Sequence, residues 1–267
     1  MRSVFSAGVL DGFIKAQFNP FDFYIGVSAG AYNLISYLSG VPGISLQVFR
    51  DLATSSEFLN YRRFFRGGHL LDLDWLLHTG LPGSKLNPGS IYQHAKPLYV
   101  GVTDVSTGQA EYINITPDNI ESAIKASTAL PLIYRGFPKI DGRPMTDGGI
   151  ADGIPVAEAI RLGAKRIMVI RSRHMNYVKR DSLWHKYIRW KLGNYPALSQ
   201  TMRERVKRFD DVIRLIRNPP GGVKILEVCP PVEFGIGRFS RNQKLLQYGY
   251  DAGFNQADDI LQRWDTL

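Results

Sequence analysis

Apolar runs with strand character alternate with helix-patterned segments along most of the chain. The runs cover residues 23–27, 97–105, 109–115, 165–172 and 223–230. Residues 106–108 predict a tight turn between the second and third runs, and helical spacing of apolar residues follows in segments such as 119–128. Strands separated by helices are typical of an α/β sheet with parallel strands. The pattern therefore predicts an α/β fold.

The two ends of the chain depart from this alternation. Residues 3–17 have helical spacing, and the apolar side chains available for one side are Val4, Phe5, Val9, Leu10, Phe13 and Ile14. In an α/β protein such a helix normally follows a strand and an anion-binding loop, and the printed sequence has neither before it. After the last strand, a closing helix is expected over 241–264. We expect one domain over 1–267, with a core at about 1–172, a helical elaboration at 174–222, and a final strand and helix at 223–267.

A loop-rich insert at 60–95 mixes aromatic residues, glycines and a leucine-rich stretch. Two interpretations stay open. The insert is either a lid over a site or a surface subdomain that packs its own small core, and the second is the simpler one.

The first candidate chemistry lies where the run 23–27 becomes a helix. Gly26, Ser28 and Gly30 have the G-x-S-x-G spacing of a nucleophile elbow. In such a turn the serine backbone is strained, and we expect side chains two residues either side of it to collide. The hydroxyl would stand at the N-terminus of the following helix, where free N–H groups favour an anion. Ser28 is therefore a candidate nucleophile, and the alternative is a glycine-rich packing turn.

A serine nucleophile needs a base, and two kinds of base remain open. One is a histidine: His174 and His185 follow plausible acids, although His174 lies in the basic segment 171–180. The other is Asp147, which we expect in a loop. A carboxylate can act directly when a poorly solvated site raises its pKa.

Two glycines, Gly148 and Gly149, follow that aspartate. Glycines in such a loop let the backbone pass close to another element, which we expect to be the elbow. The alternative is an ordinary turn.

Charge and composition narrow the partners. The formal net charge of +9 is concentrated in 171–180, 185–192 and 203–208, with aromatic residues interleaved in the second segment. This suits contact with an anionic membrane surface as well as a solvated basic face, and no nucleic-acid-binding signature accompanies it. We expect no nucleic-acid partner. A single cysteine, no secretory signal and no long apolar run favour a cytoplasmic protein, free or peripheral at a membrane.

Several segments carry a family likeness. Residues 26–31 (GVSAGA) and 127–149 (STALPLIYRGFPKIDGRPMTDGG), with the IPV that follows, resemble the patatin-like phospholipases. The late segments 194–213 and 237–241 are similar to a bacterial subgroup. The resemblance implies a three-layer α/β fold with a mostly parallel central sheet and helices on both faces. It also implies hydrolysis of lipid esters by a Ser-Asp dyad, with no histidine, metal or cofactor.

Carried over residue by residue, the resemblance gives each motif a role. It implies Ser28 as the nucleophile and Asp147 as the general base, which lie 147 − 28 = 119 residues apart. Gly26 and Gly30 would shape the elbow, and Ala29 would give its backbone N–H to the oxyanion hole.

The likeness begins at the start of the printed sequence. The family opens with a strand and a G-G-G-x-[RK]-G loop that forms much of the oxyanion hole, and here Arg2 matches the basic position and Ser3 the last glycine. Two functions are therefore weighed. The first is a serine acyl hydrolase of lipid esters that works through an acyl-enzyme. The second is a catalytically impaired protein that binds lipid surfaces.

Overall fold

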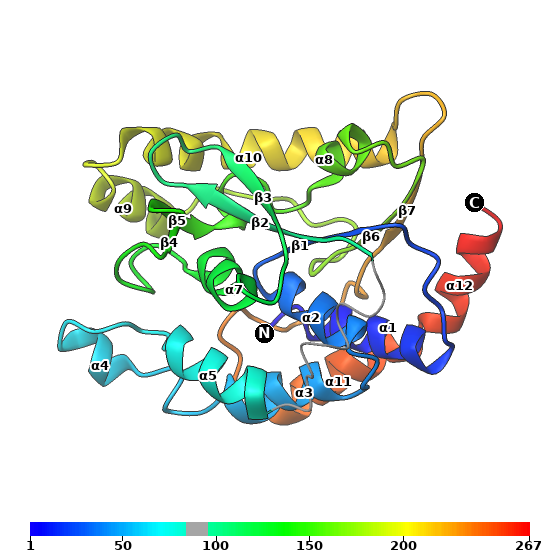
Figure 1. Cartoon of the computed structure of the whole chain (residues 1–267), viewed down its shortest axis with the longest axis horizontal. Coiled ribbons are helices and arrows are strands. Elements are labelled where there is room, and N and C mark those ends of the chain that lie inside the picture. The colour runs from blue at the N-terminus through cyan, green and yellow to red at the C-terminus, as the bar shows by residue number, and fades with distance from the viewer. Residues whose placement is uncertain (84–95) are drawn as a thin grey trace.

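The computed structural model describes residues 1–83 and 96–267, in which two sheets lie between layers of helices (Figure 1). A five-stranded sheet contains β1 (Tyr24–Val27), β2 (Leu98–Asp104), β3 (Ala110–Asn114), β4 (Lys139–Ile140) and β5 (Arg143–Asp147). A two-stranded sheet contains β6 (Arg166–Ile170) and β7 (Lys224–Val228). The strands predicted from the five apolar runs are confirmed.

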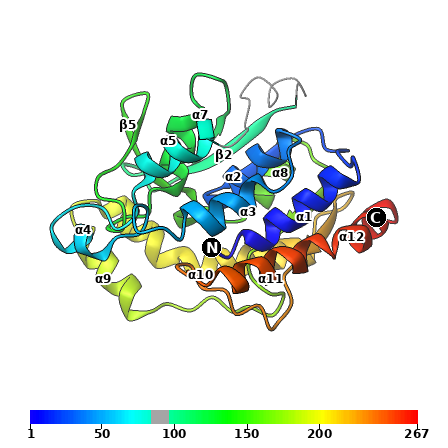
Figure 2. The ribbon, with the colours of Figure 1, turned by 90° about the horizontal axis from the view of Figure 1, so that it is seen from below.

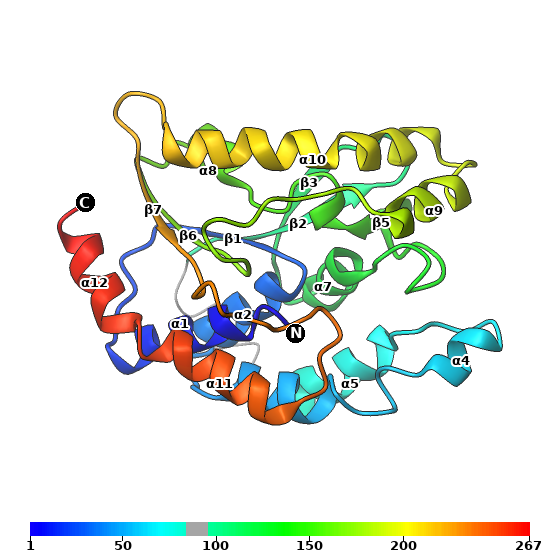
Figure 3. The ribbon, with the colours of Figure 1, turned by 180° about the vertical axis from the view of Figure 1, so that it is seen from behind.

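Helices cover both faces, as predicted. One face carries α8 (Val156–Arg161) and α10 (Pro196–Arg217), and the other carries α1 (Val4–Lys15), α2 (Ala29–Leu38) and α7 (Ile120–Thr128) (Figures 1 and 3). The remaining helices are α3 (Ile44–Gln47), a π-helical turn (Val48–Leu52), α4 (Tyr61–Phe65), α5 (Leu73–Gly83), α9 (Leu183–Lys191), α11 (Gln243–Phe254) and α12 (Ala257–Asp265). The α/β class is confirmed, and the division of the chain into parts stays a prediction.

Strand pairing is less parallel than expected. Of the described ladders, β1–β2 and β6–β7 are parallel, whereas β2–β3, β2–β5 and β4–β5 are antiparallel. The hairpin turns at 106–108 and 141–142 are too short for the crossover that a parallel pair needs. The β4–β5 hairpin was not predicted, because Gly142 and Pro144 are residue types typical of turns.

The two sheets meet at edges that carry no strand partner in the described parts of the chain. There β1 pairs only with β2, and β6 pairs only with β7. Phe23 and Ile25 pack against the cluster that contains Ile167 and Val169, so apolar side chains bridge the two edges. Residues of both edges line one cavity of about 1290 Å³, which also reaches the elbow.

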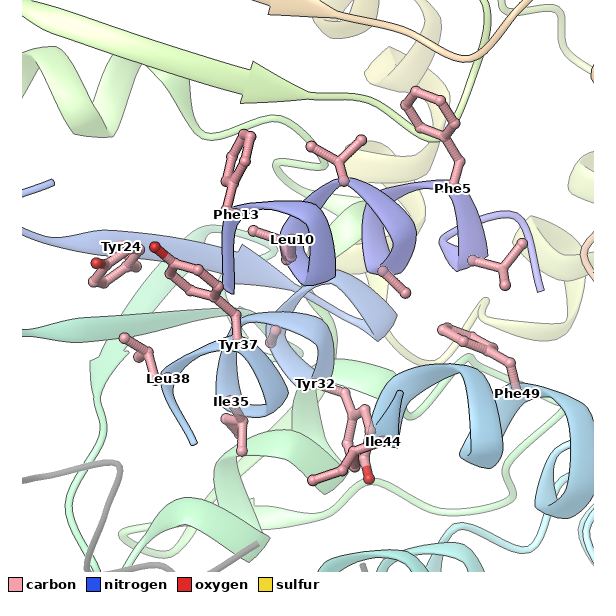
Figure 4. Close-up of a cluster of buried hydrophobic side chains, with 14 of the residues drawn as sticks. Phe5, Leu10, Phe13, Tyr24, Tyr32, Ile35, Tyr37, Leu38, Ile44 and Phe49 are labelled. Carbon is pink, nitrogen blue, oxygen red and sulfur yellow. The ribbon is translucent and has the colours of Figure 1, made fainter. Parts of the chain in front are cut away.

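The helix α1 is more deeply buried than a one-sided pattern predicts. Every residue from Val4 to Phe13 is buried, because α1 lies between α2 and α11 (Figure 2). A side chain at Gly8 would overlap the carbonyl of Tyr250 in α11, so the two helix backbones are in contact. Figure 4 shows Phe5, Leu10 and Phe13 of α1 in the same cluster as aromatic and aliphatic side chains from β1, α2 and α3. The expectation of an amphipathic first helix is wrong for this reason.

The closing helix is two helices. The segment 241–264 is broken at residues 255–256, between α11 and α12. The break lets α11 pack along α1 while Trp264 of α12 packs against the guanidinium of Arg166, whose carbon is 4.4 Å from the ring centroid.

The described part of the insert does not have a core of its own. Leu70, Leu71 and Leu73 share a cluster with Ile133 and Tyr134, which come from the connection between α7 and β4. The interpretation as a separate subdomain is therefore wrong for residues 60–83, and residues 84–95 lie outside the described residues. Leu71 also lines the cavity. A lid movement stays a prediction.

Candidate active site

The turn from β1 into α2 holds Ser28 in a strained conformation. Its φ is 55° and its ψ is −131°, a region that side-chain-bearing residues rarely occupy. A Cβ at Gly26 would lie 2.5 Å from the Cα of Ala31, so this position needs glycine. A Cβ at Gly30 would meet nothing within 4 Å, so the expected collision at the second glycine is wrong. Only the first glycine of the motif is required by local packing.

The strand β2 brings Asp147 to this turn. One edge of β2 pairs with β3, and β1 and β5 share the other edge. On that shared edge Val27 pairs with Gly101, and Asp147 pairs with the next residue, Val102. The last residues of β1 and β5 therefore lie at neighbouring positions of β2. Asp147 is the last residue of β5, so the predicted loop position is wrong. The Oγ of Ser28 donates a hydrogen bond to Oδ2 of Asp147, at 2.9 Å.

The carboxyl group of Asp147 is almost completely enclosed, with 5% of the residue exposed. Its Oδ1 accepts a hydrogen bond from the backbone N–H of Gly149, at 2.8 Å. Burial raises the pKa of Asp147 above its ordinary value, against the lowering influence of the Arg238 charge and of these hydrogen bonds. A raised pKa makes the carboxylate a stronger base.

The glycine after this aspartate permits a close approach, as predicted, although to β2 rather than to the elbow. A side chain at Gly148 would overlap the carbonyl oxygen of Gly101. Gly101 is the residue that pairs with Val27. The backbone after Asp147 therefore passes β2 directly beside the end of β1.

A third polar residue supports the elbow. Ser127, at the end of α7, accepts a hydrogen bond from the N–H of Ser28 at 2.7 Å and donates one to the carbonyl of Gly101 at 2.6 Å. Ser127 is fully buried. Sequence reasoning did not assign it a role, and its local signal is only a small polar residue on the buried face of a helix.

The histidines of the described residues do not contact the pair. His69 Nδ1 accepts a hydrogen bond from the Arg135 N–H at 2.7 Å, and His185 Nδ1 lies 2.7 Å from Ser182 Oγ. The ring of His174 lies edge-on to Tyr177. None of them has a hydrogen bond to Ser28 or Asp147, and His94 lies outside the described residues.

Two groups expected at the oxyanion hole line the same cavity as the serine. Ala29 begins α2 and lines the same cavity as Ser28, and its N–H has no hydrogen-bond partner among the described residues. Arg2 lines this cavity too. Burial and the charges of Arg173 and Arg238 lower the pKa of Arg2 to about 10. The roles of Ala29 and Arg2 in catalysis stay predictions.

Other chemistries find less support. In residues 1–83 and 96–267, no cluster of His, Cys, Asp and Glu side chains is arranged to hold a metal ion. Burial raises the pKa of the Cys229 thiol to about 11, which disfavours its reactive thiolate. None of the described helices has both the length and the apolar character that crossing a membrane requires.

Comparisons with known proteins identify the family of the chain. A model of the patatin-like phospholipases matches residues 1–160, which include Ser28 and Asp147. A domain of unknown function (DUF6363) matches residues 195–267, which include α10 to α12. The chain is 37% identical over 235 residues to the uncharacterized protein YjjU of Escherichia coli strain K12, a match that covers 86% of this chain and 66% of YjjU. The chain thus spans slightly less than two thirds of that relative. From the match over residues 1–160, the chain belongs to the patatin-like phospholipase family.

Proposed function

We propose that this protein is a serine hydrolase of the carboxylic ester bonds of lipids, with Ser28 as nucleophile and Asp147 as general base. The observation that carries the proposal is the 2.9 Å hydrogen bond from Ser28 Oγ to Asp147 Oδ2, made inside a large cavity. The raised pKa of Asp147 supports it, because a base of higher pKa takes the serine proton more readily.

The reaction would proceed in two halves. Asp147 takes the hydroxyl proton as Ser28 Oγ attacks the ester carbonyl carbon, and the backbone N–H of Ala29 stabilises the oxyanion that forms. Collapse of this intermediate breaks the bond to the alcohol, which receives the proton from Asp147, and leaves an acyl-serine. Asp147 then takes a proton from water, whose oxygen attacks the acyl carbon, and the proton returns to Ser28 as the fatty acid leaves.

The walls of the cavity suit an acyl chain. Phe58, Leu71, Leu130 and Ile133 line it together with Ser28. A cavity of about 1290 Å³ is large enough for a lipid chain and part of a head group.

The test is hydrolysis of a short-chain chromogenic ester and labelling by a fluorophosphonate. We expect Ser28→Ala to lose both, and Asp147→Asn to lose at least a hundredfold in rate. Matched controls are Ser122→Ala, on the exposed side of α7, and Asp141→Asn, in the β4–β5 turn, which should behave as the parent protein. Labelling that persists in Ser28→Ala would show a different nucleophile.

A second function is favoured by the surface of α9. Leu183 is 80% exposed and Trp190 is 70% exposed, and Lys191 Nζ lies 4.8 Å from the centroid of the Trp190 ring. Exposed aromatic residues beside basic residues are typical of helices that lie in a membrane interface. We infer peripheral contact of a cytoplasmic protein with an anionic membrane, either to reach its substrate or as its main activity.

This second function predicts salt-sensitive sedimentation with phosphatidylglycerol vesicles and little with phosphatidylcholine vesicles. The double variant Leu183→Ala, Trp190→Ala should reduce sedimentation at least tenfold. Tyr248→Ala, at another exposed aromatic residue on α11, is the control. Equal sedimentation with both kinds of vesicle would contradict this function.

A further inference from the structure

The cavity around the serine and aspartate has a one-sided charge. Eight basic residues line it. Lys165, Arg166 and Arg171 lie in or next to β6, and a second group of five comes from other segments of the chain: Arg2, Arg173, Lys179, Arg205 and Arg238. In the described parts of the chain, none of the five lies within ion-pair distance of an acidic side chain. The acidic residues that line the same cavity are Asp22 and Asp147.

These cations repel one another. Burial and the charges of Arg205 and Arg238 lower the pKa of Lys179 to about 7. Burial and the charge of Arg205 lower the pKa of His185, which also lines the cavity, to about 4. Cations that lose their hydration without gaining an anion cost free energy. An anion bound among them would offset this cost.

Two of the arginines have donors ready for such an anion. Arg205 Nη1 and Arg173 Nε are buried, and neither has a hydrogen-bond partner among the described residues. A buried unpaired donor is expensive unless a ligand or water takes its hydrogen bond. The fork of guanidinium donors matches the oxygens of a phosphate group.

Two aromatic rings beside these cations already face one of them. The ring of Tyr177 has the Arg173 guanidinium carbon 4.4 Å from its centroid, and the ring of Phe209 has Lys179 Nζ at 5.3 Å. These two ring faces are therefore already used, and the excess of positive charge around them disfavours a quaternary ammonium group. Of the two carboxylates that line the cavity, that of Asp147 already accepts the hydrogen bond of Ser28.

We propose that these five side chains form a subsite for the phosphate of the lipid substrate, and that the preferred substrates carry a phosphomonoester with no cationic head substituent. The proposal rests on the proposed function, because it places the phosphate beside an ester bond that Ser28 attacks. It assigns a binding role to α10 and to the segment before α11, which lie outside the region that matches the patatin-like phospholipases.

Binding is measured first, without turnover, on the folded Ser28→Ala variant. Glycerol 3-phosphate at about a hundred times its dissociation constant should raise the melting temperature by about 5 °C, and glycerol at the same concentration should not. The double variant Arg205→Gln, Arg238→Gln in the same background should lose this rise. Arg203→Gln, an exposed arginine on the same helix, should keep it. A rise that survives in the double variant would overturn the subsite.

Selectivity is measured second, on the parent protein with one acyl chain. We expect lysophosphatidic acid to be hydrolysed at least tenfold faster than the monoacylglycerol and at least tenfold faster than lysophosphatidylcholine. The double variant should reduce these ratios of rates about tenfold or more, because a charged hydrogen bond is worth at least a factor of ten. Inorganic phosphate that binds while the ratio stays near one would identify a free-anion site and overturn the lipid proposal.

The two tests separate this proposal from the proposed function. Binding of glycerol 3-phosphate by a protein that hydrolyses no ester would overturn the hydrolase and leave the phosphate site supported. Hydrolysis of neutral esters with no binding of glycerol 3-phosphate would overturn the phosphate site and leave the hydrolase supported.

Discussion

Ser127→Ala is the substitution that tests the construction of the elbow most directly. The Ser127 hydroxyl joins the N–H of Ser28 to the carbonyl of Gly101, in a position with no solvent exposure. Alanine removes both hydrogen bonds and leaves two backbone groups with one partner fewer. Each buried group deprived of its partner costs about 1–3 kcal/mol, so for two groups we expect the free energy of unfolding to fall by about 2–6 kcal/mol.

The same hydrogen bond holds the strained backbone of Ser28, whose φ is 55°. Without it the turn can relax, and the hydroxyl then loses its position relative to Asp147. A misplacement of about 1 Å at a reacting atom costs roughly a hundredfold, so we expect kcat for ester hydrolysis to fall by about 10- to 100-fold with little change in KM.

Urea denaturation followed by fluorescence measures the first effect, and steady-state kinetics measure the second. The drop in melting temperature should be roughly 4–24 °C, at about 2–4 °C per kcal/mol for a chain of this size. Ser122→Ala is the matched control, because it lies on the exposed side of the same helix and should change stability by less than about 0.5 kcal/mol. If Ser127→Ala were as stable and as active as Ser122→Ala, the support of the elbow by α7 would be refuted.

Three further predictions follow from the same geometry. In the proposed mechanism Asp147 acts as a base only when it is ionised, and burial raises its pKa, so kcat/KM should fall on the acid side at a pH above the ordinary aspartate pKa of about 3.9. Arg238→Gln removes a positive charge that lowers this pKa and should move the acid limb to still higher pH. An acid limb at or below pH 4 would contradict this reasoning. The raised pKa means that ionised Asp147 destabilises the folded state, so Asp147→Asn should be more stable than the parent protein at neutral pH. This gain in stability should disappear as the pH falls through the folded-state pKa to below about 3.9, where the carboxyl group is protonated in both states. Denaturant unfolding at pH 4 and pH 7.5 measures the difference. Gly26→Ala should lower the free energy of unfolding by about 1–3 kcal/mol, because its Cβ would lie 2.5 Å from Ala31 Cα. Gly30→Ala has open space at its Cβ and should be as stable as the parent protein or more so. Equal melting temperatures for the two variants would contradict the packing argument.

Much of the fold is visible in the sequence because it is locally encoded. The strand runs at 23–27, 97–105 and 165–172 and the helix at 119–128 appear where apolar spacing places them. The hairpin at 106–108 was also visible, because its turn residues lie between two such runs. Local patterns failed at β4 and β5, where glycine and proline resemble a loop and pairing with β2 overrides the local preference.

The candidate site divides in the same way. Ser28 and its flanking glycines form a motif because the constraint acts within five residues, at a single turn of the backbone. That motif could not show which glycine is needed, and only the packed turn reveals that Gly26 meets Ala31 while Gly30 faces open space.

The partners of Ser28 were decided by the tertiary structure. Spacing alone left both a histidine and Asp147 open as the base, since 119 residues of chain place no geometric limit on which side chain arrives. The strand β2 settles the arrangement, because it pairs with β1 at Gly101 and with β5 at Val102 and so brings the two ends together. The basic side chains of the cavity come from four separate regions of the chain. The sequence by itself determined the elements and the tight turn at Ser28, which are set by local sterics and apolar spacing. The contact of Ser28 with Asp147, the support from Ser127 and the charge of the cavity depend on long-range pairing and packing, which only the folded structure decides.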